Sequence, residues 1–432
     1  MGEAPFVRVR IHASRAAEFS EARPKKSHMK RIFDPVHGFI ELYPAEARLL
    51  DLPAMQRLRR LRQLGLAYLA FPAAEHSRFT HAVGALAMGT RVFDTITRED
   101  AGTLSSRGDV AYQRRLVRAA LLLHDVGHGP FSHACESALG VRHESRTERI
   151  LAMPDVRDGL DACEVDASDV LGLILGNSHS YPALREIVSG PNLDADRMDY
   201  LLRDAYFTGV VSGRYDADQL VASMRLIERD GSSVLGIDVR GVVSLESFIL
   251  ARYMMFASVY FHHTTRMFER VLYEVLHEMW PNPHTLDPID EFLRWDDFRV
   301  IEHLRDAHSD AARALRDRLR IYALAAEFNA SSDLADFEAC QAALCERFGA
   351  ENVWADEQSQ VLHRLPMSAD HGPTVWVKTR NQIVDARAVS DLIAKLTGKA
   401  YWRKLFVTTA HVDVAQAREV CATIVGRRHA AT

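Results

Sequence analysis

Apolar residues recur at helical spacing through most of the first half of the chain, and this pattern restricts the fold more than any other feature of the sequence. The stretch 45–64 spaces its leucines in this way, with arginines on the other face, and so does FTHAVGALAMGTRVFDTI, which places His81 in a first helical turn. A third stretch, VAYQRRLVRAALLLHDVG, carries His124 and Asp125 at its end, where Gly127 terminates the helix. Further helices are expected at 144–153, 167–176, 182–188 and 196–206, and two more in the apolar run 243–280. The sequence therefore predicts a mainly α fold.

Residues typical of strands come later in the chain. The alternation SVLGIDVRGVV at 233–243 predicts a short hairpin, and PTVWVKT and KLFVTTA carry the β-branched and aromatic residues of strands. The region 351–373 is polar and acidic, and we expect the linker there. The expected parts are a flexible tail at 1–28, a helical catalytic core at 29–215, a helical extension packed on the core at 216–350, and a small mixed α/β module at 351–432.

Composition and charge exclude several classes of protein. Hydrophobic residues make up 47% and charged residues 26% of the 432 residues, as in globular proteins and unlike disordered or fibrous ones. The formal net charge of -5 gives no global positive field for a nucleic-acid backbone, so nucleic-acid binding is left open but not expected. The clustered side chains Arg57, Arg59, Arg60 and Arg62 are interpreted as a solvated helical face rather than a binding patch.

Cysteine spacing and hydropathy bear on the cellular setting. The five cysteines form no CxxC pair, which disfavours both a structural zinc site and a disulfide framework. No uninterrupted apolar run approaches the roughly 20 residues of a membrane span. We therefore expect reduced thiols, no membrane insertion and a cytoplasmic protein.

The adjacent pair His124 and Asp125 carries the strongest chemical signal, because His128 and His133 follow it closely. Imidazole nitrogens and carboxylate oxygens together suit divalent transition metals, and no thiolate lies nearby in the sequence. The alternative is that these are capping and surface histidines near a tight turn. The sequence predicts a divalent metal ion here and leaves its identity open among Mn, Fe, Ni, Zn and Mg.

The order of these motifs resembles a known superfamily. RFTH, HDVGHGPFSH, HES and DADRMDYLLRD follow one another as in the HD-domain phosphohydrolases, in which H…HD…D supplies four metal ligands. The strings QLGLAYLAFPAAEHSRFTHAVG, GHGPFSH and DRMDYLLRDAYFTG look like the dNTP triphosphohydrolases with a sterile-alpha-motif and HD domain, and like their bacterial relatives without the extra domain. The resemblance covers roughly residues 30–270 and implies an HD-domain helical core with a smaller mixed α/β C-terminal portion. The implied metal ligands are His81, His124, Asp125 and Asp196.

The resemblance also implies roles for residues around the metal. His143 would be the general acid, oriented by Glu136, since loss of an alkoxide needs a proton and imidazole titrates near neutral pH. The alternative is that His143 begins a helix and Glu136 is solvated. Expected phosphate contacts are Arg78, His128, His133, Arg197 in place of a family lysine, and His262 from a later helix whose family arginine is missing here. Expected sugar contacts are Gln63, Tyr200 and Asp204, with Tyr200 alternatively a core aromatic.

Three functions are weighed. The first is metal-dependent hydrolysis of deoxynucleoside triphosphates to deoxynucleoside and inorganic triphosphate. The second is hydrolysis of another nucleotide phosphoester at the same metal, and the third is a nucleotide- or nucleic-acid-binding protein without turnover. Because relatives assemble, a homo-oligomer is expected, and the apolar run 243–280 is expected to form core or a subunit interface.

Overall fold

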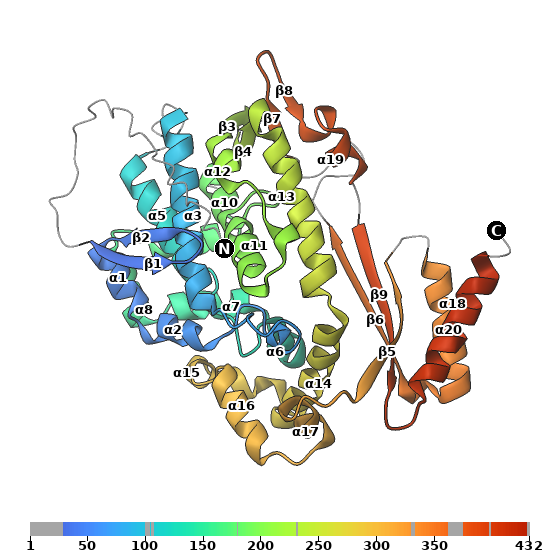
Figure 1. Ribbon diagram of the computed structural model, residues 1–432. Helices are drawn as coiled ribbons and strands as arrows, with labels where there is room; N and C mark the ends of the chain where they lie inside the picture. Colours follow the sequence, from blue (N-terminus) through green and yellow to red (C-terminus); the bar gives the residue numbers. More distant parts are fainter. Residues whose placement is uncertain are drawn as a thin grey trace, which may run out of the picture.

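The structure is a computed structural model, and it combines a helical core with a smaller sheet-containing unit near the C-terminus (Figure 1). The mainly α prediction is confirmed. The predicted tail at 1–28 lies outside the described residues. The described ranges are 29–99, 104, 108–178, 180–229, 232–329, 333–361, 375–396 and 399–429.

Three long helices form the centre of the core. Helix α3 (Arg78–Glu99) packs against both α5 (Val110–Leu123) and α11 (Ala195–Thr208). Fully buried Leu86 and Leu121 show that the apolar faces of these helices meet in the core, as their periodicity predicts. The surrounding helices are α1 (Pro44–Leu50), α2 (Pro53–Arg57), α6 (His133–Leu139), α7 (His143–Leu151), α8 (Pro154–Ala162), α9 (Ala167–Ile174), α10 (Pro182–Ser189) and α12 (Ala217–Ala222).

The predicted helix at 45–64 is wrong as a single element. Helix α1 ends before Asp51, and α2 begins at Pro53, with a short 3-10 turn η1 (Leu58–Arg60) after it. Proline disfavours helical backbone in the residue before it, so Leu52 adopts an extended conformation and caps α2. The chain therefore bends twice here and brings Gln63 beside the core.

The apolar run 243–280 forms two helices, as predicted. Helix α13 (Val242–Met255) and helix α14 (His263–Met279) are joined by a π-helical turn (Phe256–Tyr260). The stretch Val239–Tyr260 is long and apolar enough to cross a membrane by length and composition, and 56% of its most apolar window is buried inside the fold. Small helices follow at α15 (Ile289–Leu293), α16 (Asp297–Asp306) and α17 (Asp310–Arg316).

Two small sheets border the helical core. The first is a hairpin of β1 (Lys30–Asp34) and β2 (Gly38–Leu42), which the sequence analysis did not predict. The second has the order β3-β4-β7-β8, in which β4 (Ser232–Asp238) pairs with the preceding β3 (Met224–Arg229). The predicted hairpin within 233–243 is therefore wrong, because its second half forms a 3-10 turn and the start of α13. The remaining elements are β7 (Trp376–Lys378), β8 (Ile383–Asp385) and α19 (Asp391–Lys395).

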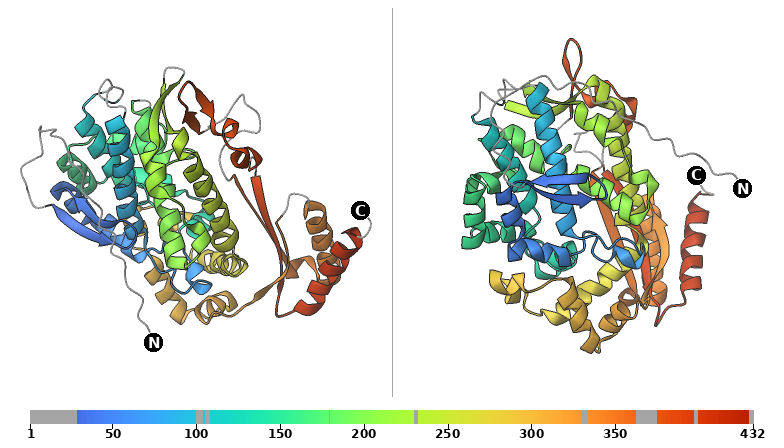
Figure 2. Two further views of the ribbon diagram at one scale, coloured as in Figure 1. Left: turned by 45° about the horizontal axis from the view of Figure 1, so that its top comes forward. Right: turned by 60° about the vertical axis from the view of Figure 1, so that its left-hand side comes forward.

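The C-terminal unit is a three-stranded antiparallel sheet of order β5-β9-β6. Its strands are β5 (Tyr322–Phe328), β6 (Val353–Val361) and β9 (Lys399–Thr408), and helices α18 (Leu334–Phe348) and α20 (Val414–His429) cover the side away from the core (Figure 2). The strand predicted from KLFVTTA is confirmed in β9. The linker predicted at 351–373 is wrong over 353–361, which forms β6, and 362–374 lie outside the described residues. The sheet also joins elements from both sides of the boundary expected at residue 350.

A buried ion network ties the first hairpin to α11. Arg203 is fully buried and donates to both Asp199 and Asp34, with nitrogen-to-oxygen distances of 2.8 to 3.2 Å. Both carboxylates are also buried. Removing one partner of such a network leaves the other charges buried and unpaired, which costs far more than losing a surface pair.

We expect Arg203→Met to lower the free energy of unfolding by about 3–5 kcal/mol, because Asp34 and Asp199 lose their counter-charge. Arg31→Met is the matched control, since Arg31 forms an exposed ion pair with Glu41 and should change stability by less than about 1 kcal/mol. Urea and thermal unfolding followed by circular dichroism would measure both variants. Equal effects of the two substitutions would contradict the proposed importance of the network.

Candidate active site

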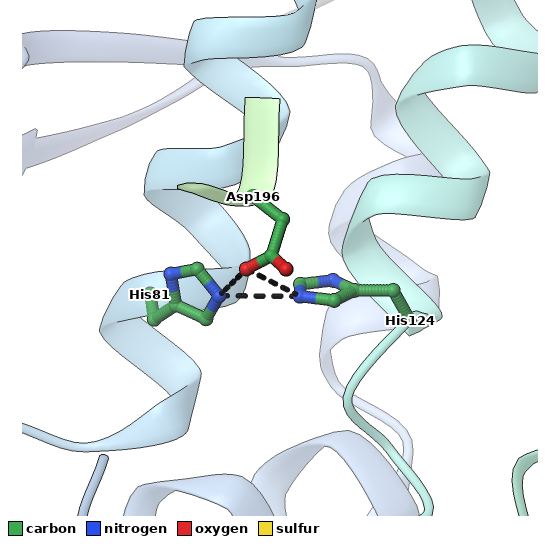
Figure 3. A group of neighbouring side chains, drawn as sticks. All are labelled: His81, His124 and Asp196. Atoms are coloured by element: carbon green, nitrogen blue, oxygen red, sulfur yellow. Dashed lines mark hydrogen bonds and ion pairs between the residues drawn. The ribbon is translucent and has the colours of Figure 1, made fainter. Parts of the chain in front are cut away.

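Three helix ends converge on a cluster of His81, His124 and Asp196 (Figure 3). His81 lies in the first turn of α3, His124 caps the end of α5, and Asp196 lies in the first turn of α11. The Nε2 atoms of the two histidines are 3.1 Å apart, and Asp196 Oδ1 lies 3.0 Å from His81 Nε2 and 3.6 Å from His124 Nε2. Residues that are up to 115 positions apart in the sequence therefore present their ligand atoms to one point.

Asp125 adds a fourth donor to this cluster. Its Oδ1 is 3.4 Å from His124 Nε2, and its Oδ2 is 3.9 Å from His81 Nε2. Two imidazoles and two carboxylates are a donor set that suits a divalent transition metal, and they match the four ligands expected from the sequence. The residues present thus fit a divalent cation.

Hydrogen bonds on the far side of each ring fix the orientation of the two histidines. His81 Nδ1 is 2.8 Å from Asp199 Oδ2, and His124 Nδ1 is 2.8 Å from the carbonyl oxygen of Leu121. A partner on Nδ1 holds the proton there and leaves the Nε2 lone pair for a cation. Asp199 is in turn held by His37, whose Nε2 lies 2.6 Å from Asp199 Oδ1. The sequence analysis did not predict that these residues would support the histidines, although Asp199 and Arg203 lie one helical turn apart in the DADRMDYLLRD motif.

A glycine makes room for this support. A Cβ atom on Gly84 of α3 would lie 2.0 Å from Arg203 Nη2 and 2.1 Å from Asp199 Oδ1. Any side chain here would displace the pair that orients His81. The small residues of the HAVGALAMG segment therefore serve close packing around charged groups as well as helix contact.

The charges of the cluster favour a cation. Burial alone would lower the pKa of His81, but hydrogen bonds and ion pairs with Asp196 and Asp199 outweigh burial and raise it to about 10. Burial also opposes charge on Asp196, yet the neighbouring His124 and His81 lower its pKa. Without a bound metal ion, the cluster therefore holds a proton strongly. A divalent cation would compete with that proton for the same position.

A second group lies beside the cluster, in the segment that follows the His-Asp pair. His143 Nδ1 is 2.9 Å from Glu136 Oε1, and the same oxygen lies 3.2 Å from His128 Nδ1. The rings of His128 and His143 stack with centroids 3.9 Å apart. Burial and the nearby Arg78 lower the pKa of His128 to about 4, so this ring is neutral at pH 7. The structure thus brings Glu136 against His143, as the resemblance implied.

The loop between the two groups is tightly constrained. A Cβ on Gly127 would lie 2.2 Å from the His143 carbonyl oxygen, so glycine permits α7 to approach the end of α5. Phe131 and Ser132 have positive φ values of 52° and 58°, a conformation that costs energy for residues with a side chain. The Oγ atom of Ser132 accepts a hydrogen bond of 2.8 Å from Arg78 Nε. The strained loop therefore positions Arg78 beside Asp125, with which its guanidinium forms an ion pair.

Part of the arginine cluster that was predicted to be a solvated face contacts this loop and holds it in place. Arg57 is 1% exposed and donates to the carbonyl oxygens of His128 and Trp295. Arg62 lies 3.8 Å from Asp297, whose other oxygen accepts the backbone N–H of Phe131. The solvated-face interpretation is wrong for Arg57, which is buried, and Arg62 is only partly exposed, with a side-chain exposure of 15%.

A cavity of about 750 Å³ opens onto both groups. It places Gln63, Tyr200 and Asp204 in one wall, with Gln63 Oε1 buried and without a hydrogen-bond partner among the described residues. Asp204 is already engaged, since His76 and the hydroxyl of Tyr260 lie 2.8 and 2.7 Å from its two oxygens. The predicted site residues that line the cavity are Gln63, Arg78, Asp125, His128, His143, Asp196, Tyr200 and Asp204.

Two predicted phosphate contacts, Arg197 and His262, lie outside the cavity lining, and the side chain of a third, His133, is not among those described. Arg197 is turned toward Asp194 and the carbonyl oxygen of Gly190, and it does not line the cavity. His262 caps α14, stacks on His263 and also lies outside the cavity lining. His133 begins α6, but its side chain lies outside the described residues. These three roles stay predictions from the sequence.

We expect the affinity of the metal-free protein for Mn²⁺ to rise with pH between about pH 6 and pH 8, by close to tenfold per unit. The pKa of His81 is raised to about 10 without a metal, so the histidine is protonated in this range and must release a proton on binding. Titration calorimetry in two buffers of different ionisation enthalpy would count that proton. In Asp199→Asn one of the two carboxylates that raise the pKa of His81 is removed, and a weaker pH dependence is expected. An affinity independent of pH in the unaltered protein would contradict the assigned cluster.

Comparisons with known proteins agree with this geometry. Residues 78–204 match the family model described as HD domain, and residues 215–422 match the HD associated region. The chain is 36% identical to the uncharacterized protein YwfO of Bacillus subtilis, over 59% of this chain and 56% of that protein. It is 31% identical to the deoxynucleoside triphosphate triphosphohydrolase SAMHD1 of Homo sapiens, over 47% of this chain and 37% of that protein. The match therefore spans less than two thirds of these curated relatives. A hypothetical protein from Aquifex aeolicus has a similar structure, with a TM-score of 0.77, 30% identity and coverage of 91% of this chain and 99% of that one. The chain belongs to the HD superfamily of phosphohydrolases.

Proposed function

We propose that the chain hydrolyses deoxynucleoside triphosphates to deoxynucleoside and inorganic triphosphate. One observation carries the proposal: the metal cluster, the His143–Glu136 pair and the wall of Gln63, Tyr200 and Asp204 face one cavity. The first two serve phosphoester hydrolysis in general, and the third is the set expected to hold a deoxyribose. The similarity to the human triphosphohydrolase supports the same substrate class.

The reaction joins a water oxygen to the α-phosphorus and breaks the bond from that phosphorus to the sugar O5′ atom. His81, His124, Asp125 and Asp196 would hold a divalent cation, which would supply Lewis-acid polarisation of the phosphoryl oxygen and lower the pKa of water. Arg78 lies at the edge of the cluster, paired with Asp125, where its guanidinium can contact a phosphate oxygen. The positive charge of Arg78 would attract the triphosphate and partly neutralise its negative charge.

The departing O5′ atom needs a proton, and His143 is the group we assign to provide it. Glu136 engages Nδ1 of His143, which fixes the tautomer and turns Nε2 away from the carboxylate. His143 lines the cavity. Together with His128 and Asp125 it forms a group of three side chains that borders the metal cluster. A proton can thus pass from His143 to the leaving oxygen without crossing protein.

Tyr200 and Gln63 are assigned to the sugar. Tyr200 lines the cavity with its ring 6.4 Å from that of His81, so a ribose held against it would lie near the metal cluster. A ring packed under the sugar leaves little room for a 2′-hydroxyl, which is the basis for preferring deoxynucleotides. Gln63 Oε1, which has no hydrogen-bond partner in the described part of the chain, can accept a hydrogen bond from a sugar hydroxyl. Asp204 has both oxygens engaged by His76 and Tyr260, which supports a role in holding that wall and leaves less capacity for the 3′-hydroxyl.

We expect metal-supplemented protein to release deoxynucleoside and triphosphate from at least one dNTP, as separated by ion-exchange chromatography. His124→Ala should lose bound metal and activity together, because it removes a ligand. His143→Ala should keep the metal and lose about 10²–10⁴-fold in kcat, the usual contribution of a general acid.

The controls decide between the three functions weighed from the sequence. Release of monophosphate or another product would assign a different phosphoester to the same centre. Binding of nucleotides without any product under all five metals would favour a binding protein. Full activity of His124→Ala would sink the metal assignment itself.

A further inference from the structure

The cavity continues beyond the metal cluster to a second end, formed by helix α14 and strand β6. Alternation along β6 puts Trp354, Asp356 and Gln358 on one face, and all three line the cavity, while Val353 and Ala355 pack against the C-terminal hydrophobic cluster. The HD associated region therefore supplies a wall of a cavity whose metal ligands come from the HD domain.

Every cationic side chain that lines the α14–β6 end of the cavity is paired with a carboxylate. Arg266 makes two hydrogen bonds, of 2.9 and 2.7 Å, to the carboxylate of Asp356 and is also paired with Glu269. Arg270 is paired with Glu274 at 3.1 Å. Two cationic side chains face three carboxylates, so this end has no positive excess to hold a phosphate. A neutral group that forms hydrogen bonds suits it better.

Two uncharged polar groups are available to such a ligand. Thr265 is 2% exposed and lines the cavity, and its Oγ1 has no hydrogen-bond partner among the described residues. Gln358 lies across from α14 with its Nε2 donating to Asp356 Oδ1 at 2.9 Å, which fixes the direction of its amide. A buried hydroxyl without a partner is costly unless a ligand or water satisfies it. Gln63 Oε1 is unsatisfied in the same cavity, nearer the metal end.

We propose that the α14–β6 end of the cavity is the nucleobase subsite, in which Thr265 and Gln358 hydrogen-bond the edge of the base and set base preference. The proposal rests on a nucleotide as the substrate of the proposed function. With the phosphates at the metal cluster and the sugar against Tyr200, the base is the part of a nucleotide left to reach this end. A hydroxyl and an amide each offer a donor and an acceptor, which is what the edges of all bases require.

The test compares ligands with and without a base. Binding of the four dNTPs and of 2-deoxyribose 5-triphosphate would be measured on the metal-loaded full chain carrying His143→Ala, in which turnover is slowed, by calorimetry and by the rise in melting temperature at millimolar ligand. We expect the base to strengthen binding, and we expect Thr265→Val and Gln358→Met each to reduce the ratio of affinities with and without the base by about five- to tenfold, the usual effect of one hydrogen bond.

Thr264→Val is the matched control, since Thr264 is the neighbouring buried threonine of α14 and does not line the cavity. Its ratio should equal that of the unaltered protein. Unaltered ratios in both test variants, an equal loss for all five ligands, or no binding by any of them would overturn the proposal. Product analysis separates it from the proposed function: altered ratios without hydrolysis would leave the base subsite standing alone, and hydrolysis with unaltered ratios would remove only the subsite.

Discussion

The structure of the metal cluster depends on one buried carboxylate. Asp199 accepts hydrogen bonds from Arg203 and lies within hydrogen-bond distance of both His37 and His81. Its charge would be prohibitive to bury without these partners, and with them it joins the first hairpin, α3 and α11. The position of His81 in the cluster thus depends on a network that lies behind its ring. Gly84 shows how closely this network is packed, since a single methyl group there would collide with it.

The loop beside the cluster, from Gly127 to Ser132, is held by a different kind of constraint. The loop from Gly127 to Ser132 runs through two residues with positive φ, and backbone contacts from Arg57 and Asp297 hold it in place. Burial raises the pKa of Asp297 to about 6, and it still accepts the N–H groups of Arg62 and Phe131. Arg57 lies 71 positions from its partner His128, and Asp297 lies 166 positions from its partner Phe131. The energetic cost of the two positive φ values is therefore offset in part by contacts from α16, which lies outside the matched HD domain.

Local signals in the sequence predicted most of the helices, although not the break within 45–64. His124 and Asp125 mark a helix end and helical periodicity placed His81 in a first turn, while the resemblance in motif order implied that these residues share a site with Asp196, and the structure brings them together. Contacts between distant segments carried no such signal. Nothing local indicated that Arg57 would be buried against Phe292 and Trp295, that β4 would pair with β3 instead of folding back, or that β6 would line the cavity. Such features follow from tertiary packing, which overrides local preference.

The group that suits a metal ion and the far wall of the cavity come from different parts of the chain. The atoms that suit a metal ion lie on α3, α5 and α11, while the far wall of the cavity comes from an edge strand about 160 residues further along the chain. Substitutions on that strand can reshape what the cavity admits while the ligands stay untouched. Two chains with identical HD motifs can therefore diverge in substrate, and the motif by itself is a guide to the bond that is cut rather than to the molecule that carries it.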